Sequence, residues 1–216
     1  MADGTKESLT AIWNETPTLL RTKSAHEQWV ESLGVPIYRG YFIEDVRTLE
    51  VGKWPERECG VAFLQLAGQE GVTEARVTEI PPGKTLPPLK FALDEVVYVA
   101  GGRGLTTVWG GPGKPKRTFE WETRSLFLLP HSHTFQLTNA QGNRPARLLH
   151  TNYLPLAMSA QRDPAFFFNN PYEDPRRLDG GPGESFKEAT AVRLAEPFRV
   201  PGGGEIREIW SGNFFP

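Results

Sequence analysis

The sequence has little of several features that define whole classes of protein. It contains one cysteine, Cys59, in 216 residues, so no disulfide can form within the chain, and a reducing compartment is expected. No apolar run approaches the roughly 20 residues that cross a bilayer. The polar start, MADGTKESLTAIW, has the character of neither a signal peptide nor a transit peptide. We therefore expect a cytoplasmic protein with no membrane partner.

Neither sign of charge dominates the chain. Lys and Arg number 24 and Asp and Glu number 26, which gives a formal net charge of −2. This balance offers no general attraction to nucleic acid. The short basic stretch 114–117 is most simply the solvated tip of a hairpin. No nucleic-acid partner is expected.

Glycine and proline, in contrast, are abundant. Gly 22 and Pro 19 together make about a fifth of the chain, against an average of roughly 12%. They separate short runs rich in Val, Phe, Thr, Tyr and Leu, most of them of ordinary strand length. The expected strands are Ile37–Ile43, Val61–Leu66, Ala75–Ile80, Glu95–Ala100, Leu105–Trp109, Thr118–Trp121, Ser125–Leu129, Thr134–Leu137 and Ala146–Tyr153. Their regular spacing predicts an all-β protein built as an antiparallel barrel.

One short helix is expected before the strands. Ser24 and Glu27 have the spacing of a capping box, in which each side chain satisfies a free backbone amide of the other residue. The helix should continue to Leu33 and end at Gly34. His26 lies in its first turn, and we interpret it as a surface residue.

The character of the sequence changes after Leu154. Phe166, Phe167 and Phe168 are consecutive in an otherwise polar stretch, where exposure would be unfavourable. We expect them to pack across the barrel or into a partner subunit, in preference to forming a lid over a pocket.

The end of the chain echoes an earlier segment. Residues 209–215 (IWSGNFF) resemble residues 37–43 (IYRGYFI), and a true repeat would make the chain one half of a duplicated protein. The expected organisation is an N-terminal extension with a helix at 1–36 and a barrel at 37–155. A long C-terminal arm at 156–216 would lead into a second unit in a longer parent chain.

Two motifs give residues 75–155 a family resemblance. From Gly83 the spacing is five residues, then Leu89-Lys-Phe91, three residues, Glu95, six residues and Gly102. The segment resembles the first motif of the cupin superfamily, a jelly-roll barrel, in which histidines stand where Leu89 and Phe91 stand here.

The second cupin motif is matched between Pro130 and Asn139. Both end residues are present, while Ser132 replaces a glycine and Phe135 replaces the third histidine. The resemblance implies a cupin-type antiparallel jelly-roll barrel with a short N-terminal helix and a long C-terminal arm. The phenylalanines at 166–168 and the many strand aromatics exceed what one small barrel can bury. We therefore expect a homodimer, or a two-barrel pairing in a longer parent chain, as is common among cupins.

The replaced histidines decide what the resemblance implies for the site. In metal-bearing cupins three imidazoles and a carboxylate bind a divalent ion, but leucine and phenylalanine have no lone pair to offer. We expect no metal and no other cofactor at the usual position. Leu89, Phe91 and Phe135 should instead bind the apolar or aromatic part of a small molecule. Tyr98 and Trp109 are further candidates for ligand contact, although core packing explains most strand aromatics.

Of the four ligand positions of metal-bearing cupins, only the carboxylate is retained here, as Glu95. If it faces inward beside Phe91 and Phe135, desolvation would raise its pKa and make it a general acid or base. The alternative is that it bonds backbone or Arg103 and holds the end of a strand. His133 and His150 are candidate acid/base partners.

Three functions stay open on these residues. The first is a metal-independent enzyme of isomerase, cyclase or lyase type, with Glu95, His133 and His150 as catalytic groups. The second is a non-catalytic ligand-binding or assembly domain, the silent half of a two-cupin protein. The third is a metal-dependent oxygenase that uses the displaced histidines His131, His133 and His150. We favour the first, and the sequence does not identify the substrate.

Overall fold

The structure is a computed structural model that describes residues 23–111, 113–168 and 170, and beyond them only the backbone of four short strands. The chain divides into two compact units, Met1–Arg177 and Leu178–Pro216. In the second unit the antiparallel pairs are β12 (Val192–Arg193) with β15 (Trp210–Ser211) and β13 (Phe198–Val200) with β14 (Gly204–Ile206). The segment 209–215 lies outside the described residues apart from β15, so a second barrel stays a prediction.

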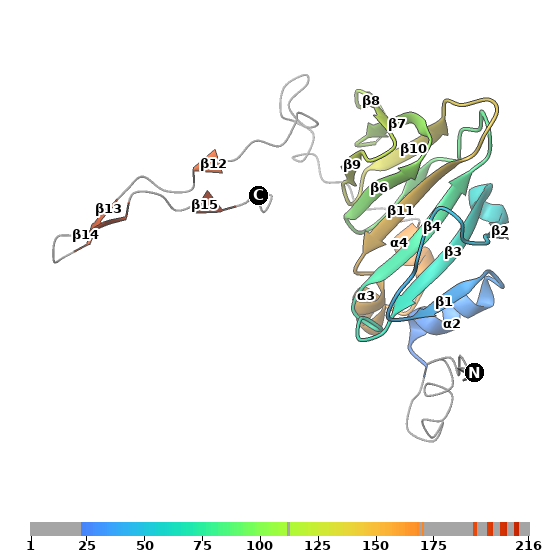
Figure 1. Cartoon of the computed structure of the whole chain (residues 1–216), viewed down its shortest axis with the longest axis horizontal. Helices are drawn as coiled ribbons and strands as arrows, with labels where there is room; N and C mark the ends of the chain where they lie inside the picture. The colour runs from blue at the N-terminus through green and yellow to red at the C-terminus, as the bar shows by residue number, and fades with distance from the viewer. Residues whose placement is uncertain are drawn as a thin grey trace, which may run out of the picture. The chain divides into compact units, whose positions relative to one another are not determined.

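Two sheets make up the described part of the first unit (Figure 1). The larger has the order β1-β3-β4-β11-β6-β9, with β2 also paired to β3, and the smaller has the order β5-β10-β7-β8. The larger contains β1 (Ile37–Gly40), β2 (Gly52–Trp54), β3 (Cys59–Leu66), β4 (Glu74–Ile80), β6 (Glu95–Gly101), β9 (Leu126–Leu129) and β11 (Ala146–Asn152). The smaller contains β5 (Leu89–Lys90), β7 (Arg103–Trp109), β8 (Arg117–Glu122) and β10 (Thr134–Asn139). Only the pairing of β1 with β3 is parallel among these strands. The predicted all-β antiparallel jelly roll is confirmed.

Each expected run contains a strand, with ends shifted by a few residues. The periodicity did not indicate β2 and β5, because strands of three and two residues are too short to show alternation. It also did not indicate α3 (Leu154–Ala160) or α4 (Pro164–Phe168). These short helices begin beside prolines, which are favourable in a first helical turn.

The N-terminal helix α2 (Ala25–Ser32) forms as predicted. The Ser24 hydroxyl accepts from the Glu27 amide at 3.1 Å, and the Glu27 carboxylate accepts from the Ser24 amide at 2.8 Å. The helix ends before Gly34, whose φ of +64° is easily adopted by glycine. The interpretation of His26 as a surface residue is wrong. Its side chain is buried, because the inner face of α2 packs on the barrel.

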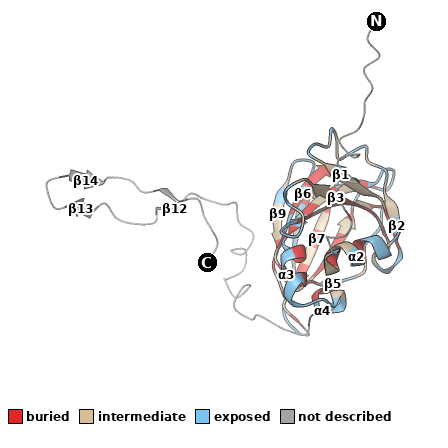
Figure 2. Ribbon diagram, turned by 90° about the horizontal axis from the view of Figure 1, so that it is seen from below, coloured by how far each residue is buried: buried red, intermediate tan, exposed pale blue. Residues whose placement is uncertain are grey.

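The three phenylalanines belong to α4 and differ in their surroundings. Phe167 is buried, and the ring of Phe168 lies 5.1 Å from those of Trp29 and Phe91. Phe166 is 44% exposed. Phe167 and Phe168 therefore pack within the first unit, whereas Phe166 is partly open to solvent. Figure 2 shows buried positions on the strands between the sheets and on the inner faces of the helices.

Two motif residues hold turns of the barrel. Ser132, at a position where cupins carry glycine, has a left-handed φ of 59° and donates its amide to the Phe91 carbonyl. The buried amide group of Asn139 donates to the carbonyls of Ile80, Pro81 and Arg144, and its oxygen accepts from the Gln141 amide. One side chain thereby joins the end of β4 to the β10–β11 turn.

Candidate functional site

Three neighbouring strands of the larger sheet direct polar side chains into the barrel. Arg76 of β4 is paired with His150 of β11, and Glu74 with Asn152 in the same ladder. Successive side chains of a strand point to opposite faces, so these four residues share the inner face. Glu95 opens β6, on the other side of β11. We call His26, Glu74, Arg76, Glu95, His150 and Asn152 the buried polar cluster.

Glu95 is the centre of this cluster and is fully buried. Its Oε1 accepts from Arg76 Nη2 at 2.6 Å and from Asn152 Nδ2 at 2.9 Å. Its Oε2 bonds His150 Nδ1 at 2.7 Å. Arg76 also binds Glu74, so one guanidinium joins two buried carboxylates. The arginine that binds Glu95 is therefore Arg76, and not Arg103 as the alternative interpretation expected.

The charged groups around Glu95 shift its pKa in the opposite direction to the one expected. Burial alone would raise its pKa, but the positive charge of Arg76 and the bonds from His150 and Asn152 lower it to about 2. Glu95 is therefore a carboxylate at neutral pH. The expectation of a raised pKa is wrong, because sequence alone did not reveal the arginine opposite it.

His150 is held in one orientation by this carboxylate. Since ionised Glu95 can only accept, His150 Nδ1 carries the proton in their bond. Burial lowers the pKa of His150, against the opposing influence of Glu95. The imidazole is thus neutral at pH 7, with a bare Nε2. Within the described residues, Nε2 has no hydrogen-bond partner.

A small interior cavity is lined in part by the side chain of His150. Its free volume is about 20 Å³, which admits about one water molecule. The larger sheet contributes Arg76, Thr78, Glu95 and His150, which we call the polar wall. The smaller sheet contributes Leu89, Phe135 and Leu137, which we call the apolar wall.

The polar wall contains a second buried atom that has no hydrogen-bond partner within the described residues, Arg76 Nε. Arg76 Nε is a donor and His150 Nε2 is an acceptor, so two residues that line the cavity carry one unpaired group of each kind. A buried polar group without a partner is costly and calls for a water or a ligand. The arrangement can therefore receive a small group that accepts one hydrogen bond and donates another.

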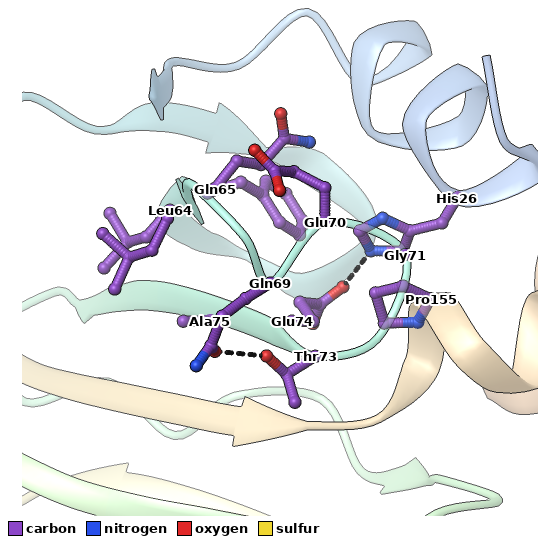
Figure 3. Close-up of a pocket in the computed structure, with 12 residues that line it drawn as sticks. His26, Leu64, Gln65, Gln69, Glu70, Gly71, Thr73, Glu74, Ala75 and Pro155 are labelled. Carbon is purple, nitrogen blue, oxygen red and sulfur yellow. Dashed lines mark hydrogen bonds and ion pairs between the residues drawn. The ribbon is translucent and has the colours of Figure 1, made fainter. Parts of the chain in front are cut away.

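The cluster extends to the end of the barrel through His26. Figure 3 shows the imidazole reaching from α2 to Glu74, beside the β3–β4 turn. The bond between His26 Nε2 and Glu74 Oε2 is 2.7 Å long. This bond links α2 to the cluster in the barrel interior.

The structure separates the other predicted site residues. Tyr98 is 39% exposed on the outer face of β6. Trp109 lies beneath the ammonium of Lys116, 4.4 Å from its ring centre. Phe91 is buried against Phe168, and His133 Nδ1 bonds the His131 carbonyl at 2.9 Å. Of the predicted residues, the cavity brings together Glu95, His150, Leu89 and Phe135.

The residues present do not fit a metal of the cupin type. The three histidine positions hold Leu89, Phe91 and Phe135, which have no donor atoms. Both Glu95 oxygens are bonded within the cluster, and the guanidinium of Arg76 would repel a cation. Across residues 23–111, 113–168 and 170, no three His, Cys, Asp or Glu side chains are placed to hold a metal. The alternative set of displaced histidines is not assembled there.

Sequence reasoning missed half of the buried polar cluster. Glu74, Arg76 and Asn152 were not singled out, although Glu74-x-Arg76 has the spacing of one strand face. The pattern could have suggested a charged interior. However, Ala75 and Val77 on the opposite face are more apolar, and simple alternation assigns the charges to solvent.

Comparisons with known proteins add little at the level of sequence. No protein-family model matches the chain, and no curated protein matches it. Similar solved structures cover about half of it. The Schizosaccharomyces pombe Cnp3 cupin domain is 18% identical over 50% of this chain and 71% of that chain, with a TM-score of 0.41.

Two further structures give values in the same range. Lactobacillus farciminis oxalate decarboxylase, in a formate complex, is 16% identical over 51% of this chain and 34% of that chain, with a TM-score of 0.42. Peruvianin-I, a cysteine peptidase from Thevetia peruviana latex, is 14% identical over 52% of this chain and 71% of that chain, with a TM-score of 0.44. This chain thus spans about a third of the oxalate decarboxylase.

The strand order and the motif positions define the class. Gly83, Glu95 and Gly102 lie around β5 and β6, and Pro130 and Asn139 bracket β10, on two facing sheets. The described barrel has a cupin fold, and its site pairs a charged wall with an apolar one. Among the described helices, none is long and apolar enough to cross a membrane.

Proposed function

We propose that the cavity is the reaction site of a metal-independent enzyme that transfers a proton on a small molecule. The observation that carries the proposal is His150, whose side chain lines the cavity, whose Nδ1 is fixed by Glu95 and whose buried Nε2 has no hydrogen-bond partner within the described residues. A neutral imidazole with one nitrogen held by a carboxylate is a suitable general base. Isomerases, cyclases and lyases of this type need no electron acceptor.

The other groups of the polar wall have distinct roles in this proposal. Glu95 does not exchange protons near neutral pH, so it orients His150 and stabilises the imidazolium formed when Nε2 takes a proton. Arg76, whose Nε has no hydrogen-bond partner in the described part of the chain, stabilises negative charge that develops on a ligand oxygen. His133 does not line the cavity, and we assign it no catalytic part.

The experiment is proton exchange in D2O, followed by proton NMR. A panel of 2-oxo acids and aryl ketones is incubated with the protein, and loss of the α-proton signal is measured. His150→Gln should lower exchange by about two to four orders of magnitude. His131→Gln is the matched control, because His131 Nδ1 also faces a carboxylate, Asp94 at 3.2 Å, but outside the cavity.

Nitrogen NMR of the labelled histidines tests the same site without a substrate. We expect His150 to be protonated on Nδ1 and bare on Nε2 at pH 7. A protonated Nε2 at neutral pH would contradict its role as a base, whatever the panel shows.

One observation favours the second candidate, a non-catalytic domain. Glu95 makes bonds to β4 and β11 through Arg76, His150 and Asn152, and thereby ties three strands together. A cluster with that structural purpose would leave proton exchange at the buffer rate in every variant. The exchange experiment therefore decides between the two candidates.

The predicted homodimer also remains a proposal. Phe167 and Phe168, which suggested it, pack within their own unit. The outer face near β6 and β9 still exposes Val96, Tyr98 and Leu126. Light scattering at micromolar concentration would give a dimer mass if the proposal is correct.

A further inference from the structure

A second and larger pocket opens next to the interior cavity. Its free volume is about 330 Å³, which lies in the range of small-molecule sites. We call it the outer pocket, and its lining includes Trp29 of α2, Trp54 of β2, Phe168 of α4, Pro88, and Glu56 and Arg57 of the turn between β2 and β3. Aromatic rings from three separate elements thus meet around one arginine.

The outer pocket and the interior cavity have a common boundary. Trp54, Arg57 and Leu89 line both of them, so these three side chains separate the two spaces. The interior cavity admits only about one water molecule. A ligand larger than one water molecule does not fit in the interior cavity, so its body would lie in the outer pocket.

Arg57 is the unusual group at this boundary. It ends the short 3₁₀ helix η1 (Pro55–Arg57), which lies between β2 and β3. Nη2 donates to the Pro87 carbonyl at 3.0 Å and Nη1 to the Pro88 carbonyl at 3.3 Å. Both acceptors are neutral, and within the described residues no carboxylate forms an ion pair with Arg57.

A cation that is partly removed from water without an anion is unfavourable. Burial lowers the pKa of Arg57 from its ordinary value, although the side chain stays charged at pH 7. Glu56 also lines the outer pocket, but it is exposed and makes no ion pair with Arg57. A carboxylate on a ligand would offer Arg57 the bidentate, charged partner that the two carbonyls do not provide.

We propose that the outer pocket binds a planar aromatic carboxylate, with the carboxylate on Arg57 and the ring against Trp29, Trp54 and Phe168. The inference rests on the proposed function only for the group that reaches His150. Aromatic rings also receive quaternary ammonium ions. The positive charge of Arg57 within the same pocket opposes such a cation and favours an anion.

Benzoate is the probe for this proposal, titrated into the whole protein and followed by the indole NH signals in a proton–nitrogen NMR spectrum. We expect saturable shifts of the Trp29 and Trp54 signals. Benzamide has the same shape without the charge and should bind at least 10-fold more weakly. Benzyltrimethylammonium, which carries the opposite charge, should give no saturable shift.

Variants then locate the carboxylate. Arg57→Gln should weaken benzoate at least 10-fold, and Arg57→Lys should weaken it less, because lysine keeps the charge but loses the fork of donors. Phe168→Leu should weaken the binding of benzoate, but benzoate should still bind more tightly than benzamide. Arg47→Gln is the matched control, since Arg47 is exposed and already paired with Asp45.

Equal binding of benzoate and benzamide to the wild-type protein would overturn the proposal, as would binding of the ammonium probe alone. This comparison needs no variant, so it holds even if Arg57→Gln does not fold. His150→Gln separates the two proposals, because it should abolish proton exchange and leave benzoate affinity unchanged. Benzoate binding without any exchange would refute the enzyme and keep the ligand class.

Discussion

The larger sheet presents Arg76, Glu95 and His150 to the interior cavity, whereas the smaller sheet presents Leu89 and Phe135 to the same space. Metal-bearing cupins, as the motif positions imply, carry imidazoles where this protein has the two apolar residues. Here the charged groups are on the opposite sheet and are bonded to one another. The comparison shows that an acidic residue at this motif position can be bonded to an arginine of the same sheet.

The largest effect should follow from removing the arginine of the polar wall. Arg76→Met leaves Glu74 and Glu95 buried together without a cation, and we expect the free energy of unfolding to fall by about 3–5 kcal/mol. Urea denaturation measures it. Arg147→Met is the matched control, since Arg147 pairs with Glu79 across the same two strands but on the outer face. Arg147 also donates to the Leu49 carbonyl, so a loss of about 1–2 kcal/mol is expected there. Equal losses in the two variants would erase the difference between the two faces.

Glu95→Gln should have the next largest effect. The amide keeps the shape but not the charge that faces Arg76, and we expect a loss of about 1–3 kcal/mol at pH 7. The pH dependence follows from the lowered pKa. Glu95 takes up a proton near pH 2 when folded, against about 4.5 when unfolded. The unfolded chain therefore binds more protons between these values, and stability falls as the pH falls through that window.

The variant should lose the part of this acid dependence that belongs to Glu95. Unfolding midpoints measured from pH 7 to pH 2 would decline less steeply in Glu95→Gln than in the wild-type protein. If the midpoints of the variant and the wild-type protein declined in parallel, Glu95 would have an ordinary pKa. The difference between the polar wall and the apolar wall would then rest on geometry alone.

A change in the apolar wall should behave differently. Phe135→Leu removes packing but no charge, so we expect a loss of about 1–1.5 kcal/mol from the smaller side chain. The acid dependence should remain that of the wild-type protein, which thermal melts at several pH values would show. A changed pH profile would mean that the two walls are coupled.

The smallest expected effect concerns metal. Because neither wall offers a set of free donors, chelation by EDTA should leave the melting temperature unchanged, and elemental analysis should find no stoichiometric transition metal. About one Mn, Fe, Ni or Zn per chain, lost together with stability on chelation, would restore the displaced-histidine alternative.

The sequence predicted the strands and the barrel but only part of the site. Turn residues and apolar runs are local signals, and they indicated β4, β6 and β11 to within a few residues. The pKa of Glu95 depends on Arg76, which lies 19 positions earlier and comes close only through the β4–β11–β6 ladder. His26 shows the same limit, because its burial depends on Glu74 of a distant strand. Such contacts are set by strand register, which residue spacing alone did not establish.

The bonds of Asn139 have a consequence for how such proteins are recognised. This residue joins the end of β4 to the β10–β11 turn through four hydrogen bonds, and none of its partners belongs to the polar wall. A sequence motif that includes Asn139 therefore indicates the fold of the main chain and gives no information about the reaction. Searches that weight turn-holding positions would retrieve barrels with unrelated reactions, whereas searches that weight the histidines would overlook this one. Grouping these barrels by activity needs the residues that face the cavity.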